Sequence, residues 1–158
     1  MVKPTKKIGV SEAIIKTRTF CNYRERCHKE VRDKLYGMGL WKVEVEEVML
    51  QMMDENLLNE ERFARSFARG YFRNKRWGKF KIKMSLRERQ IHSNLIETAL
   101  TEIDEVEYEQ SIKHLIEKKN AMIKNLSKPV RRQKISNYLL QKGYSFGEFS
   151  AYINDFLA

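Results

Sequence analysis

Residues 31–49 read VRDKLYGMGLWKVEVEEVM, and the spacing of their apolar positions recurs twice further along the chain. Residues 82–100 and 135–153 follow the same pattern. Each segment begins with an apolar residue and has a second one four positions later and a third at its tenth position. Its last two residues are also apolar. The copies begin 51 and then 53 residues apart. Self-similarity at a regular period is typical of architectures built from stacked repeats. We therefore predict one structural unit that is used three times.

Each copy has the pattern of a helix, a tight connection and a second helix, and the segment before it supplies a first helix. Gly39 and Gly143 stand at the connections, where a left-handed helix cap favours glycine. The middle copy has Gln90 there, so that helix either ends differently or costs about 1 kcal/mol. We expect nine helices, at residues 11–22, 27–38, 42–55, 59–75, 78–90, 93–102, 105–122, 128–142 and 145–156.

The predicted fold is all-α, with three tandem three-helix units. A unit of about 50 residues has little core of its own, and stacking buries the faces that a single unit would expose. We therefore expect an elongated, curved helical array. The predicted divisions are a flexible basic tail at 1–10 and units at 11–57, 58–103 and 104–158.

Composition argues against several classes of function. The chain has 158 residues, a net charge of +10, two cysteines and three histidines. Cys21 and Cys27 lack the ligand spacing of a zinc site, and no nucleotide-binding, metalloprotease or hydrolase signature occurs. We expect no catalytic residues, no metal and no cofactor, and hence no enzyme. The absence of a long apolar run or an export signal leads us to expect a cytoplasmic protein that does not enter membranes.

A basic stretch follows the first unit. Residues 62–89 hold eleven Lys or Arg and one acid, Glu88, and the arginines at the start recur every three or four positions. That spacing places them on one helical stripe, while Phe63, Phe67 and Tyr71 point to the core. Basic side chains interleaved with aromatic ones are typical of nucleic-acid contacts. The residues predicted to contact nucleic acid or an acidic partner are Arg62, Arg65, Arg69, Arg73, Arg76, Trp77, Lys79, Lys81, Lys83, Arg131 and Arg132.

Two features of this stretch have alternative interpretations. Trp77 precedes Gly78 between two helices, where its ring either stands exposed to stack on a base or fills the helix corner. The arginine stripe could also form salt bridges to Glu44, Glu46 and Glu47 of the preceding unit, at most about 1 kcal/mol each. A second basic stretch, which supports the first, holds Lys118, Lys119, Lys124, Lys128, Arg131, Arg132 and Lys134.

The junction between the first two units resembles that of the RecX family, which comprises small bacterial regulators of the RecA recombinase. Residues 54–67, DENLLNEERFARSF, are similar to the junction motif of that family, and residues 23–35, YRERCHKEVRDKL, are similar to its opening helix pair. The resemblance covers about residues 11–156 and includes the three three-helix units. Gly78-Lys79, where the family often has Gly-Pro, and Gln90, where it often has glycine, depart from the pattern.

The resemblance implies a non-enzymatic regulator, and because rod-like repeat proteins are often monomers we expect a monomer. Such a protein would bind the RecA filament on single-stranded DNA and limit ATP hydrolysis, strand exchange and co-protease activity in recombination, DNA repair and the SOS response. Two alternatives remain open from the residues alone. One is a stand-alone helical-repeat protein that binds nucleic acid without a recombinase, and the other is an adaptor whose basic face meets an acidic protein.

Overall fold

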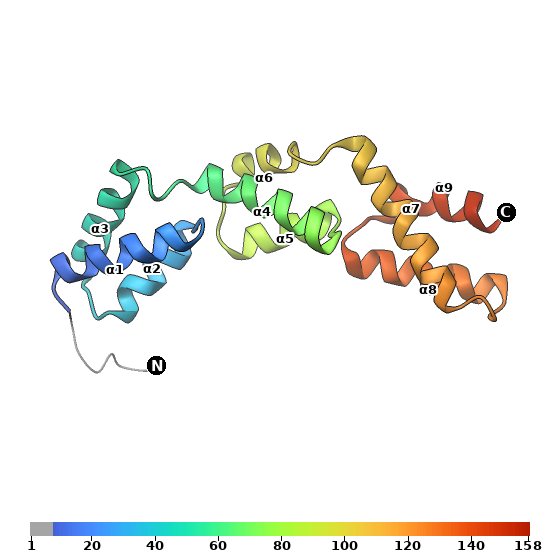
Figure 1. The fold of residues 1–158 in the computed structure, drawn as a ribbon, viewed down its shortest axis with the longest axis horizontal. Helices are drawn as coiled ribbons and strands as arrows, with labels where there is room; N and C mark the ends of the chain where they lie inside the picture. The colour runs from blue at the N-terminus through green and yellow to red at the C-terminus, as the bar shows by residue number, and fades with distance from the viewer. Residues whose placement is uncertain (1–7) are drawn as a thin grey trace.

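The computed structural model describes residues 8–158, and this part of the chain is helical and contains no strand (Figure 1). Every predicted helix is present, with each end within two residues of its expected position. Residues 1–7, most of the expected basic tail, lie outside the described residues. The helices are α1 (Val10–Tyr23), α2 (His28–Gly37), α3 (Lys42–Asp54), α4 (Glu60–Lys75), α5 (Lys79–Glu88), α6 (Ser93–Leu100), α7 (Glu105–Met122), α8 (Lys128–Lys142) and α9 (Phe146–Leu157).

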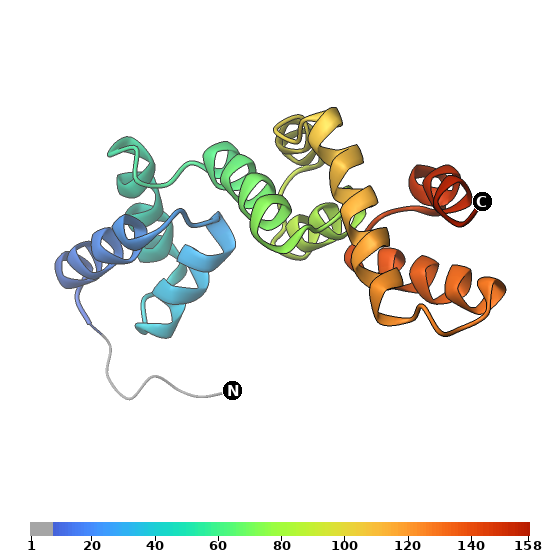
Figure 2. The ribbon, with the colours of Figure 1, turned by 45° about the vertical axis from the view of Figure 1, so that its right-hand side comes forward.

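The helices that pack most closely on one another fall into three consecutive groups of three. We call α1–α3 the first unit, α4–α6 the second and α7–α9 the third. The units follow one another along an elongated, arched body, with the two ends of the chain at opposite ends (Figures 1 and 2). The array is one unit wide, so every unit keeps much of its surface exposed.

The connections within the units confirm the repeat. Gly39 and Gly143 adopt the predicted left-handed conformation, with φ of 85° and 99°. Gln90 adopts it as well, with φ of 60°. The hydrogen bond from the Ile91 amide to the Leu86 carbonyl, 3.1 Å, completes the same helix end that glycine makes elsewhere. The middle copy therefore keeps the geometry and bears the steric cost of about 1 kcal/mol.

The hydrophobic interior is divided unequally among the units. The first unit has its own core, around Val31, Leu35 and Met49. The second and third units share one continuous core, in which Tyr108 of α7 packs against Phe72 of α4 and against Tyr144, with ring centroids 5.9 and 5.1 Å apart. The stacking expected from the sequence therefore joins the last two units into one body, and the first unit is attached by a different kind of contact.

Backbone groups lock the second unit to the third. The Gly78 amide donates a hydrogen bond to the Lys142 carbonyl, 2.7 Å, and the Phe80 amide donates one to the Gly143 carbonyl, 3.1 Å. A Cβ atom on Gly78 would lie 2.3 Å from the Gly143 oxygen, so only glycine allows this approach. The Tyr144 hydroxyl adds a bond to the Arg76 carbonyl, 2.8 Å. Two glycines 65 positions apart therefore meet in one close contact.

Polar contacts hold the first unit to the second. The Arg62 Nε atom of α4 lies 2.6 Å from Glu25 Oε1, and the His28 amide donates a hydrogen bond to Glu60 Oε1, 3.1 Å. Only Cys27 of the first unit joins the core of the second. At the chain start, Ile8 and Val10 pack against the first core, so the expected tail does not extend to residue 10.

Candidate nucleic-acid interface

The arginine stripe lies along α4 and its C-cap as predicted, and consists of Arg62, Arg65, Arg69, Arg73 and Arg76. Its first three members form ion pairs. Arg62 binds Glu25 across the unit boundary. Arg65 and Arg69 both bind Glu102, at the end of α6, with N–O distances of 2.8 and 3.2 Å. These bonds hold the pKa of the Glu102 carboxyl below its usual range, with Arg65 the larger cause.

These pairs correct the expectation that the whole stripe is available to a partner. They also differ from the alternative that we considered, since the acids that bind the stripe come from residues 25, 61 and 102. Glu46 binds Arg32 of its own unit instead. Three of the five stripe arginines therefore stabilise the arrangement of the helices.

The second half of the stripe is free. Arg73 is exposed and Arg76 is half-buried, and neither makes an ion pair with a described residue. Arg76 ends α4 with a φ of 55°, a left-handed conformation that bulky residues seldom adopt. This turn directs the chain into Trp77 and Gly78 and so toward the third unit.

Three lysines of α5 were predicted as contacts. The Lys79 ammonium lies 2.7 Å from Glu105, and the Lys83 ammonium lies 3.8 Å from Glu97. Lys81 has no ion pair within residues 8–158, and its ammonium lies 4.5 Å from the centre of the Trp77 ring. Lys81 is therefore the member of this set whose charge is left for a partner.

Trp77 fills the corner between α4 and α5. Its ring is half-buried and stacks on Tyr71, with centroids 4.3 Å apart, while Phe67 approaches its edge at 6.4 Å. The structure therefore favours the packing interpretation of Trp77. Phe63 and Phe67 are buried, as predicted, and Tyr71 packs against the same core while remaining partly exposed.

Arg131 and Arg132 lie on α8, away from the α4 stripe along the body. A guanidinium nitrogen of Arg131 donates a hydrogen bond to Asn120 Oδ1, 3.0 Å. A guanidinium nitrogen of Arg132 donates one to Asn154 Oδ1, 2.8 Å. Because the side chains of Asn120 and Asn154 are neutral, these hydrogen bonds do not compensate the positive charges of the two arginines. These residues stay secondary contact candidates.

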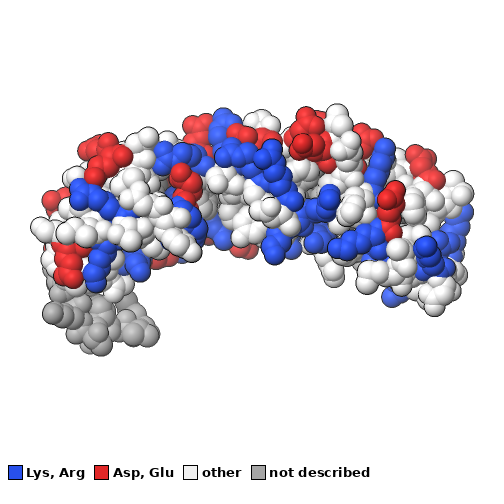
Figure 3. All heavy atoms as spheres, viewed as in Figure 1, with Lys and Arg blue, Asp and Glu red and all other residues white. Residues whose placement is uncertain are grey.

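Unpaired cations do gather at one place, where the second unit meets the third. We call Lys75, Arg76, Lys81, Lys118 and Lys142 the junction cluster. They come from the end of α4, the start of α5, the second half of α7 and the end of α8. None of them forms an ion pair with any residue in the described range. Figure 3 shows lysine and arginine side chains gathered over this middle part of the molecule.

Lys142 lies at the centre of the junction cluster. Its ammonium donates to the Lys75 carbonyl, 3.2 Å, and Lys81 approaches the Gln141 carbonyl at 3.5 Å. Partial burial lowers the pKa of Lys142, and the other four cations of the cluster lower it further. Like charges brought together without acids cost free energy, and an anionic partner would relieve that cost.

The sequence alone did not single out three of these residues. Lys75 and Lys142 are absent from the predicted contacts, and Lys118 was only part of a supporting basic stretch. The only sequence feature that marks Lys142 is its position directly before Gly143, the glycine of the third repeat copy. The close contact of Gly78 and Gly143 assembles the cluster, and no local pattern predicts that contact.

Neither a membrane span nor a metal centre adds to this site. Across residues 8–158, no helix combines the length and the apolar composition needed to cross a bilayer. The same residues contain no group of His, Cys, Asp and Glu side chains placed to hold a metal ion.

Fold and surface together define a class: tandem three-helix repeat proteins with an unneutralised cationic junction. Family models identify the member of that class. The model described as "RecX, second three-helix domain" matches residues 59–100, and the one described as "RecX, third three-helix domain" matches residues 107–153. The chain belongs to the RecX family.

Individual relatives agree with that assignment. The regulatory protein RecX of Prosthecochloris aestuarii is 30% identical over 125 residues, which cover 79% of this chain and 80% of the relative. That of Oceanobacillus iheyensis is 28% identical over 134 residues, 85% of this chain. The crystal structure of RecX from Lactobacillus salivarius has a TM-score of 0.84 at 25% identity and covers 92% of this chain and 95% of that one.

The relatives differ in length. The chain spans about half of the Oceanobacillus protein, 49%, and of the RecX of Halalkalibacterium halodurans, 47%. The similarity to the solved structure extends over all three units, because it covers nearly the whole of both chains. The all-helical fold of three-helix units is therefore shared with a known RecX structure.

Proposed function

We propose that this protein regulates the RecA recombinase by binding the RecA filament on single-stranded DNA. In this proposal it limits ATP hydrolysis, strand exchange and co-protease activity, and so acts in DNA repair, recombination and the SOS response. It works as a cytoplasmic monomer without catalytic residues of its own. Family membership supports the regulatory role, and the surface of the chain supports the kind of partner.

The junction cluster is the observation that carries the proposal. Five cations without acidic partners come from four helices of two units, and they surround the partly buried Lys142. A chain that needed them only for packing would lose nothing by pairing them, as it pairs Arg65 with Glu102. A polyanion is the partner that such a cluster fits, because each phosphate neutralises one cation and releases a counterion.

The shape of the molecule supports a filament rather than a compact partner. The body is arched and one unit wide, and it exposes a long continuous surface (Figures 1 and 2). Arg73, which is exposed on α4, continues the cationic surface from the cluster along that helix. In the proposal this surface follows the filament, and contacts on both sides of the junction restrain neighbouring protomers.

The test is the DNA-dependent ATPase of RecA on single-stranded DNA, titrated with this protein. We expect inhibition at about stoichiometric protein, and we expect Lys118→Glu to weaken it about tenfold, since a charge reversal removes one phosphate contact and adds a repulsion. Lys42→Glu is the matched control, an exposed lysine of α3 outside the cluster. An unchanged ATPase at stoichiometric wild-type protein would refute the proposal.

Binding to a free single strand, measured together with the RecA ATPase, distinguishes the two alternative functions. A stand-alone nucleic-acid-binding protein would bind a free strand, with a salt slope of about −3.5 for five neutralised phosphates, and leave RecA unaffected. A protein-only adaptor would bind the filament protein and show no affinity for the free strand. The proposed regulator inhibits the ATPase, and its affinity for the single strand falls with salt because the junction cluster neutralises phosphates.

A further inference from the structure

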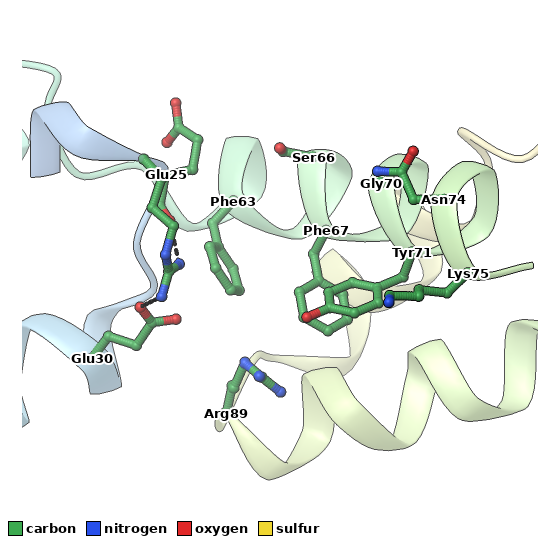
Figure 4. Close-up of a pocket in the computed structure, with 11 residues that line it drawn as sticks. Glu25, Glu30, Phe63, Ser66, Phe67, Gly70, Tyr71, Asn74, Lys75 and Arg89 are labelled. Carbon is green, nitrogen blue, oxygen red and sulfur yellow. Dashed lines mark hydrogen bonds and ion pairs between the residues drawn. The ribbon is translucent and has the colours of Figure 1, made fainter. Parts of the chain in front are cut away.

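A groove lies where the first unit meets the second, and the proposed function does not use it. Its volume is about 470 Å³, within the range of small-ligand sites. One wall is α4, with Phe63, Phe67 and Tyr71 along it (Figure 4). Opposite them are Glu30 of the first unit and Arg89 after α5.

The α4 wall carries hydrogen-bonding groups that the fold leaves unused. The Ser66 hydroxyl, the Asn74 amide and the Tyr71 hydroxyl line the groove, and none of them bonds to another group in residues 8–158. Gly70 lies between them, and a Cβ atom there would have no neighbour within 4 Å. Glycine inside a helix is unfavourable relative to alanine, and here no internal packing requires it. Its effect is to deepen the groove.

The charges of the groove are unbalanced in favour of cations. On the first-unit side Arg62 binds Glu25 Oε1, Glu25 Oε2 is buried without a hydrogen-bond partner in residues 8–158, and Arg24 binds Glu30. Within residues 8–158 Arg89 donates only to the Ser85 carbonyl, 2.9 Å, and its guanidinium lies 4.8 Å from the centre of the Phe67 ring. Lys75 has no ion pair in the described range. Two free cations therefore flank an aromatic wall.

We infer that this groove takes one nucleotide of the single strand that crosses the junction cluster. The inference rests on the proposed function, because it assigns a strand to the cluster. Lys75 belongs to both sites, so a strand held at the cluster reaches the groove along α4. The base would lie against the half-exposed Tyr71 ring and bond to Ser66 and Asn74, and its phosphate would meet Lys75 or Arg89.

The nucleotide is favoured over an acidic protein segment because it uses every feature of the groove. A carboxylate would bind the two cations but would leave the aromatic wall uncovered. A nucleobase has a flat face for the wall, donors and acceptors for the unpartnered groups, and a phosphate for the cations. Contacts between bases and aromatic side chains tolerate any sequence, so the groove would not impose a base preference.

The test fills the groove without changing charge. Gly70→Leu places an apolar side chain in the open space, and it should fold normally because leucine favours a helix over glycine. Gly147→Leu is the matched control, a helical glycine of α9 that also has no neighbour within 4 Å and lies in the third unit. Circular dichroism and thermal melting verify both folds.

Each protein is titrated with a fluorescent oligothymidylate and with an abasic strand of the same length. We expect the wild type and Gly147→Leu to bind the oligothymidylate about tenfold more tightly than the abasic strand, and Gly70→Leu to lose that difference. The salt slope should become shallower by at most about 0.7 in Gly70→Leu, since the five cations of the cluster are unchanged and only the phosphate contact of the groove is lost. Double-stranded DNA, whose bases are paired, should not distinguish the three proteins.

Three outcomes would overturn the inference. One is equal affinity of the wild type for both strands, and another is a Gly70→Leu protein that still binds the oligothymidylate about tenfold more tightly than the abasic strand. The third is a polyglutamate peptide that binds the wild type but not Gly70→Leu while oligothymidylate binding is unaffected, which would assign the groove to an acidic protein segment. None of these measurements contains RecA, so failure here is distinguishable from an unchanged ATPase, which tests the proposed function.

Discussion

The second unit contacts the third through Gly78 and Gly143. We expect a single added methyl group at Gly78 to push the two units apart. In Gly78→Ala the new Cβ atom would lie 2.3 Å from the Gly143 oxygen and 2.6 Å from the Tyr144 nitrogen, both backbone atoms that cannot rotate away. The φ of Gly78 is −75°, which alanine adopts without strain. The effect of the substitution is therefore steric and acts through the close approach of the two units.

Its magnitude follows from the bonds that must lengthen. Separation weakens the bonds from Gly78 to Lys142 and from Phe80 to Gly143, 2.7 and 3.1 Å, and each buried group left unpaired costs about 1–3 kcal/mol. The lower chain entropy of alanine returns about 0.4–1 kcal/mol. We expect a net loss of about 3 kcal/mol, which lowers the melting temperature of a chain of this size by roughly 6–12 °C.

The assay is thermal and urea unfolding followed by circular dichroism. Gly147→Ala is the control, because a methyl group there meets nothing within 4 Å and should leave stability equal or slightly higher. Gly78→Ala should also weaken the binding of single-stranded DNA, since Lys142 and Lys75 lie on opposite sides of the contact. A melting temperature within about 1 °C of the wild type would refute the reasoning.

Two further predictions concern pH. Arg65 and Arg69 hold the pKa of Glu102 low, so this carboxylate stabilises the fold above its ordinary pKa of about 4.3 and loses that effect as the pH falls through its folded value. Glu102→Gln should therefore cost about 1 kcal/mol at pH 7, and the difference from the wild type should shrink in urea titrations as the pH falls below about 4; a difference that does not shrink in acid would contradict the ion pairs. Burial raises the pKa of Tyr144 to about 12 from its ordinary value of about 10, so stability should fall as the pH rises above about 10. Melting temperatures between pH 8 and 11 should show this fall in the wild type and a smaller one in Tyr144→Phe, and identical slopes would exclude Tyr144 as a cause.

The pairs at Glu102 also revise what charge reversal on α4 would measure. If Arg65 and Arg69 were free, as the sequence led us to expect, the double substitution Arg65→Glu with Arg69→Glu would weaken binding and leave stability nearly unchanged. In the structure both guanidinium groups bind Glu102, so acids at these positions would repel it and destabilise the second unit. The junction cluster is the place where a loss of cationic charge reports on binding without breaking an ion pair.

Local information determined the helices and their caps. The apolar spacing repeated from residues 31–49 located the helix pairs, because a helix buries one face at a period of 3.6 residues. Glycines 39 and 143 marked left-handed caps, because φ above zero excludes most side chains. The sequence also marked a basic middle segment, and motif similarity predicted the family that the comparisons confirm.

Only the tertiary structure decided which charges are free and which units are joined. Arg62 and Arg65 share a stripe with Arg73, but acids 37 positions away in the chain pair with the first two and not with the third. Gly78 and Lys142 are hydrogen-bonded neighbours although they lie in different units. Ion pairs and backbone contacts of this range depend on how the units pack, and a helical period carries no information about that packing. The cationic cluster and the groove both arise at such unit boundaries.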